Sequence, residues 1–113
     1  MISGGGSNLR IGVLGGIGPE STAVFYTKLI EKLQATGLIK SNTDFPQIII
    51  NSVPAPELIR DNHKAIEHYE RGLKELDSFG IDFIVMVCNT VHLFLPRLQR
   101  SVKTKILDLR EAV

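Results

Sequence analysis

The sequence predicts an α/β domain with a four-stranded parallel sheet and helices on both of its faces. Two observations support this prediction: short apolar runs alternate with longer segments of helical period, and the runs are apolar throughout, with no alternating polar residues. Such strands are covered on both faces, and helical crossovers between them give parallel pairing with right-handed connections.

The predicted strands are residues 11–14, 48–50, 83–87 and 105–109. The longest uninterrupted apolar run, residues 83–88, is far too short to span a membrane. Residues 110–113 would open a further element.

Three segments between the strands have the apolar spacing of helices. They are residues 20–36, residues 61–79, and a shorter segment that begins near Thr90 and ends close to Pro96 or a turn beyond it. Pro19 suits the first turn of the first helix, because the N–H that proline lacks is not needed there. Gly37 and Gly80 are suitable stops for the first two helices.

The length of 113 residues predicts one domain. Thirteen basic and twelve acidic residues leave a net charge of +1, so no strong field favours nucleic acid or an anionic membrane as a partner. We expect residues 1–9 to be a flexible leader, because they lack the pattern of a signal peptide, and residues 10–113 to form the domain. A single cysteine excludes an intrachain disulfide and favours a cytoplasmic location.

Three unusual segments directly follow predicted strands: residues 15–20, 51–57 and 88–90. In open α/β sheets, ligands bind beyond the carboxyl ends of the strands. We therefore expect these segments to meet at one edge of the sheet and to form the functional site.

Cys88 ends a predicted strand and precedes a predicted helix, with Asn89 or Thr90 as the cap. Free amides and the positive end of a helix dipole favour a thiolate, which can act as a nucleophile or as a base toward carbon. The alternative is a small buried core residue. The adjoining loops favour the reactive thiol.

The Gly-rich turn at residues 15–18 leads into the first helix, where backbone amides can bind an anion. Its glycines match neither a dinucleotide-binding motif nor a Walker motif. Since Pro19 removes one donor, a carboxylate fits better than a pyrophosphate. A tight strand-to-helix turn without a ligand is the alternative.

His92 follows Cys88 by four residues and could tune the thiol, pack near it or have no role. We expect no metal, because two ligands do not make a zinc site. His63 and His68 lie on the polar side of the second helix. Asn51 and Glu57 lie in a loop that can reach a ligand.

Two motifs resemble those of the aspartate/glutamate racemase family. The turn Gly15-Gly16-Ile17-Gly18-Pro19-Glu20-Ser21-Thr22 is similar to the family's N-terminal G-G-M-G-P-E-A-T signature. Val87-Cys88-Asn89-Thr90-Val91-His92 is similar to the P-C-N-T-A-H signature around its first catalytic cysteine. The resemblance runs from about Arg10 to the last residue.

The resemblance implies an amino-acid racemase that uses no cofactor. Such enzymes have two α/β halves, each of which contributes one cysteine. One thiolate removes the α-proton and the thiol on the opposite face returns one. The resemblance makes Cys88 catalytic and assigns the substrate carboxylate to Gly16, Gly18, Asn89 and Thr90, with Asn51 nearby.

The resemblance also implies partners for this chain: a small carboxylate or amino-acid substrate, the missing C-terminal half, and a second copy in a homodimer. The apolar segment 91–98 would suit an interface with the absent half or with a dimer partner. We expect the isolated half to be inactive.

The sequence departs from the family at Pro56-Glu57-Leu58, where some aspartate-specific members have Pro-Asp-Arg. Either Arg60 binds the distal carboxylate of the substrate in place of that arginine, or this interaction is missing and the enzyme accepts a broader range of amino acids. Glu20 and His92 are further candidates for the site. The alternatives are a related carbon-acid enzyme, such as a hydantoin racemase, maleate isomerase or decarboxylase, and a non-catalytic carboxylate-binding remnant.

Overall fold

The computed structural model describes residues 9–16, 18–56, 58–87 and 90–107. In this part of the chain, the α-helices are α1 (Pro19–Ala35), α2 (Leu58–Asp77) and α3 (Leu95–Gln99), and the strands are β1 (Arg10–Gly15), β2 (Gln47–Ser52), β3 (Phe83–Met86) and β4 (Lys105–Ile106). Two short 3₁₀ helices, η1 (Asn42–Asp44) and η2 (Thr90–Phe94), complete the elements.

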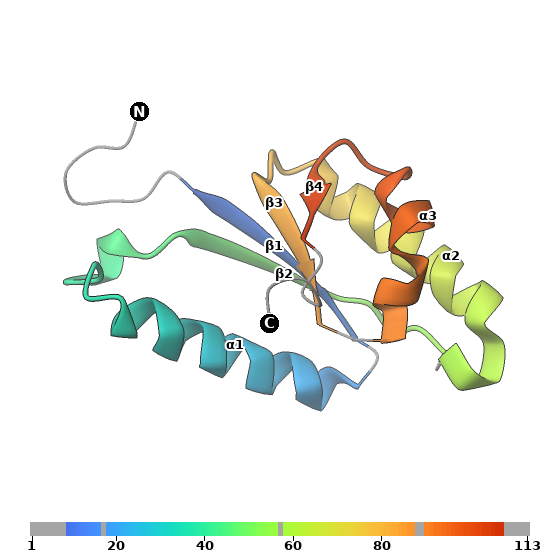
Figure 1. Ribbon diagram of the computed structural model, residues 1–113, viewed down its shortest axis with the longest axis horizontal. Helices are drawn as coiled ribbons and strands as arrows, with labels where there is room; N and C mark the ends of the chain where they lie inside the picture. Colours follow the sequence, from blue (N-terminus) through green and yellow to red (C-terminus); the bar gives the residue numbers. More distant parts are fainter. Residues whose placement is uncertain (1–8, 17, 57, 88–89, 108–113) are drawn as a thin grey trace.

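The four strands form one parallel sheet in the order β2-β1-β3-β4. Helix α1 lies on one face of this sheet, and α2 and α3 lie on the other (Figure 1). The predicted fold class is therefore confirmed. Strand β1 is central, and five of its six residues are buried.

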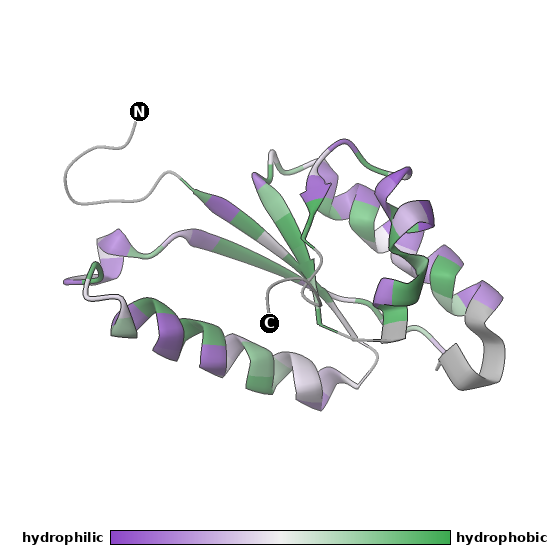
Figure 2. Cartoon of the chain, in the orientation of Figure 1, coloured by the Kyte–Doolittle hydropathy of each residue, from purple (hydrophilic) through white to green (hydrophobic). Residues whose placement is uncertain are grey.

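The core has two unequal parts, one on each face of the sheet. The part on the α2 and α3 face is larger and includes Leu14, Tyr69, Leu73, Met86 and Leu98. The part on the α1 face has three buried residues, Ile11, Val13 and Val85, against which Phe25 and other partly buried side chains pack. Apolar residues gather along the strands and along the sheet-facing side of α2 (Figure 2).

Helix α2 approaches the end of β2 closely at Gly72. A Cβ added there would lie 2.6 Å from Val53 Cγ2 and 2.9 Å from Leu14 Cδ1. The absence of a side chain at Gly72 thus lets the helix pack against the strand ends that carry the candidate site.

The strand boundaries correct the sequence-based prediction at β2. Asn51 and Ser52 were predicted to open a loop, but they pair with Leu14 and Gly15 as the last residues of the strand. The reason is the register with β1: Val53 N–H continues the ladder and donates to Gly15 O at 2.8 Å.

The third helix also differs from the prediction. We expected one helix from Thr90, but the chain forms the 3₁₀ helix η2 and only then the short helix α3. Pro96 stands at the start of α3 and has no N–H to donate to the preceding turn, so an α-helix cannot continue through it unbroken.

The 3₁₀ helix η1 was not predicted, although the sequence carries a signal for it. Asp44 Oδ2 accepts hydrogen bonds from the N–H groups of Lys40 and Ser41, at 2.8 and 3.1 Å. Ser41 and Asp44 have the spacing of a capping box, which marks the start of a short helical turn.

None of the helices in the described ranges combines the length and the hydrophobicity that a bilayer crossing needs.

Candidate active site

The candidate site lies at the carboxyl edge of the three adjacent strands β2, β1 and β3. Two hydrogen bonds tie this edge together: Val53 N–H donates to Gly15 O at 2.8 Å, and Val87 N–H donates to Leu14 O at 3.0 Å. The chain segments that follow β2 and β3 are thus both fastened to the end of β1. The predicted meeting of residues 15–20 and 51–57 at one edge is confirmed for their described residues, whereas residues 88 and 89 of the third segment lie outside the described part of the chain.

The Gly-rich turn is shaped by backbone contacts. Gly16 has a φ of 117°, and a Cβ added there would overlap Val53 O and lie 2.5 Å from Val53 N. Gly18 has a φ of 72° and is the N-cap of α1. The glycines allow the turn after β1 to lie directly against the chain that leaves β2.

Two amides of this turn are used within it. Gly16 N–H donates to Thr22 Oγ1 at 3.3 Å, and Ser21 N–H donates to Gly18 O at 3.0 Å. Pro19 has no N–H. The turn therefore offers an anion fewer donors than the sequence alone indicated, and the substrate-binding function of Gly16 and Gly18 stays a prediction.

Thr22 is a residue of this site that the sequence analysis did not select. Its side chain is buried, facing the sheet from the first turn of α1, and its methyl and hydroxyl groups lie against Gly15. Thr22 thus sets the position of the turn by accepting the Gly16 N–H. The signal available in the sequence was a polar residue among the apolar positions of the helix that face the sheet.

Asn51 has a structural function at the end of β2. Its Nδ2 donates to Gly72 O at 3.1 Å and to Glu75 Oε1 at 3.0 Å, so both N–H groups bind α2. The side chain therefore lies on the α2 face of the sheet. Its contact with a substrate stays a prediction. The carboxamide oxygen takes no part in these two hydrogen bonds.

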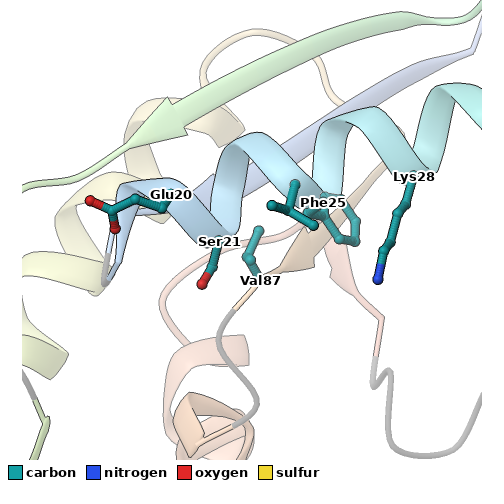
Figure 3. A pocket seen from close by; sticks show the side chains of 6 residues that line it. Glu20, Ser21, Phe25, Lys28 and Val87 are labelled. Atoms are coloured by element: carbon teal, nitrogen blue, oxygen red, sulfur yellow. The ribbon is translucent and has the colours of Figure 1, made fainter.

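Two open hollows flank the first turn of α1. The hollow beside β3 has a volume of about 380 Å³ and is lined by Glu20, Ser21, Val24, Phe25, Lys28 and Val87 (Figure 3). The hollow beside β2 has a volume of about 530 Å³ and is lined by Gly16, Pro19, Ser52, Pro54 and Ala55. Volumes of a few hundred Å³ suit small ligands.

The hollow beside β3 combines opposite charges with an apolar wall. Glu20 and Ser21 project from the first turn of α1 and Lys28 from a later turn, with Val87 across from them (Figure 3). Val87 is the last described residue before Cys88, which itself lies outside the described residues. Glu20 is exposed at the rim of the hollow.

Several predicted site residues lie outside the described part of the structure. These are Cys88, Asn89 and Glu57, together with the side chains of Arg60 in α2 and Thr90 in η2. Their predicted functions stay predictions.

The three histidines have different surroundings. His92 is fully buried in η2. His63 is exposed and lies 3.5 Å from Glu67 Oε1, and His68 Nδ1 lies 2.7 Å from Arg71 Nη2. Among the residues with described side chains, no three groups of the kinds that bind metals come together.

The segment 91–98 packs in part within the domain, and its predicted function as an interface stays a prediction. Val91 and Leu98 are fully buried in the core, and Phe94 and Leu95 pack against it. Leu93 alone among these apolar side chains is well exposed, at 67%. The segment therefore contributes to the core of the domain and also presents an exposed leucine.

Residues 14–113 match the Asp/Glu/hydantoin racemase family, and the chain belongs to this family. It is 32% identical over 107 residues to the broad-specificity amino-acid racemase RacX of Bacillus subtilis. That alignment covers 89% of this chain and 46% of the relative. The chain thus spans about half the length of this relative.

Solved structures agree with this assignment. An aspartate racemase homologue from Pyrococcus horikoshii superimposes with a TM-score of 0.76 at 27% identity, covering 91% of this chain and 46% of that one. The aspartate racemase of Picrophilus torridus gives 0.66 at 27% identity, covering 91% and 69%. A protein described as an Asp/Glu racemase from Yersinia pestis has the same fold, with a TM-score of 0.77 at 22% identity, covering 92% and 46%.

Proposed function

We propose that this chain is the N-terminal half of a cofactor-independent amino-acid racemase and supplies Cys88 as one of its two acid–base thiols. The observation that carries the proposal is the place of Val87. It binds the end of β1 through its N–H and lines the hollow of about 380 Å³, which Glu20 and Ser21 of the first motif also line. Val87, the first residue of the second motif, thus lies beside residues of the first motif.

The chemistry requires two groups on opposite faces of Cα. The Cys88 thiolate takes the α-proton and becomes a thiol, and the electron pair of the C–H bond stays on the substrate as a carbanion. A thiol on the other face then delivers its proton to Cα and becomes a thiolate. The carbanion needs nearby hydrogen-bond donors, which the amides beside Gly18 and after Cys88 would supply.

We propose a broad amino-acid substrate range for the whole enzyme rather than strict specificity for aspartate. The second loop reads Pro56-Glu57-Leu58 and lacks the arginine of aspartate-specific members. The Bacillus subtilis relative is named for broad specificity. The apolar wall formed by Val24, Phe25 and Val87 agrees with side chains that carry no distal carboxylate.

The proposal is tested by alkylating Cys88 with iodoacetamide over a range of pH. Since the chain has one cysteine, intact mass reports this thiol alone. We expect the rate to follow an apparent pKa below the value of about 8.5 for a free thiol. We also expect amino acids to slow the reaction.

The matched control is the double variant Cys88→Ala/Leu38→Cys. Leu38 is 76% exposed in the loop after α1, so a cysteine there is an ordinary surface thiol. If Cys88 reacts no faster than this reference thiol and with the same pH dependence, the proposed acid–base function is wrong.

A further inference from the structure

We propose that the hollow beside β3 is a substrate subsite and that it selects amino acids with apolar side chains of the size of leucine. In this arrangement Ser21 binds the carboxylate and Glu20 binds the ammonium group. The side chain lies along the apolar wall of the hollow, formed by Val24, Phe25 and Val87. The inference rests on the proposed racemase function and names the substrate class.

Two oxygen atoms of the first turn of α1 lie close to one point beside Gly18. The position that a Cβ of Gly18 would take is 3.5 Å from Ser21 Oγ and 3.9 Å from Glu20 Oε2. A hydroxyl donor and a carboxylate acceptor are thus both within reach of one small ligand. The carboxylate and the ammonium group of an amino acid are attached to the same carbon, so these two side chains can bind them together.

The hydroxyl of Ser21 supplies a donor that the backbone of the turn does not. Gly16 N–H donates to Thr22 Oγ1, and Ser21 N–H donates to Gly18 O. Pro19 has no N–H. The family signature G-G-M-G-P-E-A-T has alanine where this chain has Ser21, so the hydroxyl is a feature of this chain and not of the shared motif. Ser21 lies beside Val87 in the hollow (Figure 3).

The apolar wall has a firm part and an exposed part. Phe25 and Val87 are partly buried and pack against the core on the α1 face of the sheet. Val24 is 54% exposed. A ligand side chain that covers this wall removes apolar surface from water, and each CH₂ group that becomes buried strengthens binding by up to about fourfold.

The charged groups stand at the two ends of the hollow. Glu20 and Lys28 both line it and are separated by about 12 Å along the axis of α1, with Val24 and Phe25 between them. When the ammonium group of aspartate is at Glu20, its short side chain ends on the apolar wall, where the carboxylate loses water and gains no partner. Leucine has the same branched skeleton but ends in methyl groups. The hollow therefore favours leucine over aspartate.

The first test is an NMR titration of the full chain with leucine and with aspartate. We expect leucine to shift the amide signals of α1 and of the end of β3, with a Kd on the order of 1 to 10 mM. Aspartate should bind about tenfold more weakly. Val24→Lys places an ammonium group on the wall and should remove this preference. Leu93→Lys, at another exposed apolar residue, should leave it unchanged.

The second test assigns the two polar contacts with ligands that lack one charge each. 4-Methylpentanoate has no ammonium group, and 3-methylbutylamine has no carboxylate. We expect Ser21→Ala to weaken binding of leucine and 4-methylpentanoate about tenfold and to leave the amine unaffected. Glu20→Gln should weaken leucine and the amine and leave 4-methylpentanoate unaffected. Both residues are exposed, so these substitutions preserve the fold.

Ser52→Ala is the matched control, because Ser52 is an exposed serine in the hollow beside β2. It should leave leucine binding unchanged. Aspartate binding as tightly as leucine, no binding of leucine, or a loss on Ser52→Ala in place of Ser21→Ala would overturn the inference. The titration involves no reaction of the thiol, so an ordinary Cys88 in a chain that binds leucine as expected would contradict the acid–base function alone.

Discussion

At the candidate site, Gly16 is important because the absence of a side chain leaves space for the backbone of the neighbouring loop. Gly16 has a left-handed φ and touches the backbone of Val53, which leaves no room for a side chain. Gly37 also has a left-handed φ, of 77°, but a Cβ there would meet no atom within 4 Å. Alanine substitutions at Gly16 and Gly37 therefore distinguish the cost of backbone strain from the cost of steric overlap.

We predict that Gly16→Ala lowers the free energy of unfolding by about 3 kcal/mol, because it combines a strained φ with overlap against backbone atoms that cannot move aside. Gly37→Ala should cost only about 1 kcal/mol, since it introduces the strain alone. Urea denaturation of both variants measures the difference. Equal losses at the two positions would contradict the close contact between Gly16 and Val53.

Between elements, a single carboxylate joins the end of α2 to the turn before β4. Asp77 Oδ1 accepts two hydrogen bonds from Thr104, one from the hydroxyl and one from the backbone N–H at 3.2 Å. Asp77 Oδ2 accepts a hydrogen bond from the backbone N–H of Lys103 at 3.2 Å. The pKa of Asp77 is lowered from the ordinary value of 3.8, and the hydrogen bond from the Thr104 hydroxyl is the largest cause. Burial opposes this effect, whereas the two backbone N–H groups and the charge of Lys103 lower the pKa further.

A lowered pKa means that the charged form of Asp77 stabilises the fold. This contribution is complete above the unfolded pKa of about 3.8 and is lost as the pH falls through the lower folded pKa. We predict that Asp77→Asn lowers stability by about 1 to 2 kcal/mol near neutral pH. The loss of stability between about pH 7 and about pH 3 should also be smaller than in the unmodified chain. Urea denaturation at both pH values checks this.

Glu31→Gln is the control for Asp77→Asn, because Glu31 is an exposed carboxylate on α1. It should leave the pH dependence of stability unchanged. An Asp77→Asn variant with the same acid sensitivity as the unmodified chain would show that this carboxylate does not stabilise the turn before β4.

For the whole molecule, the central fact is that the first family motif and Val87 of the second lie at one edge of the sheet, while the chain has a single cysteine. The two hollows beside the first turn of α1 are open to solvent rather than enclosed between two halves. Inversion at Cα requires an acid–base group on each face of the substrate.

We therefore predict that this chain alone does not interconvert the enantiomers of aspartate, glutamate or other amino acids. Chiral chromatography after incubation in deuterium oxide measures both inversion and exchange of the α-proton. Racemisation by the chain, abolished by Cys88→Ser, would contradict the need for a second half. Racemisation that survives this substitution would instead argue against Cys88 as the base.

The sequence was sufficient to predict the fold because its signals are local. The apolar runs that became β1 and β3, the helical period of α1 and the stops at Gly37 and Gly80 each depend on neighbours within a few residues. The parallel order then follows from the alternation of strands and helices. The position of the candidate site at the carboxyl edge is a consequence of that topology.

Contacts between residues distant in sequence decided the rest. The register of β1 with β2 placed Asn51 in a strand and directed its amide to Gly72 and Glu75. The same register directs the backbone N–H and C=O groups of Ile50 away from β1, toward the outer edge of the described sheet. Local patterns carry no information on register or on which strand lies at the edge, because both are set by packing across the whole domain.

By itself, therefore, the sequence determined an α/β domain that resembles the racemase family, with its two motifs after predicted buried strands. Only the tertiary structure decided that Thr22 holds the Gly-rich turn, that Val91 and Leu98 lie in the core and that β2 is an edge strand of the described sheet. The physical reason is that periodicity and capping act along the chain, whereas burial and hydrogen-bond partners depend on what the folded chain brings together.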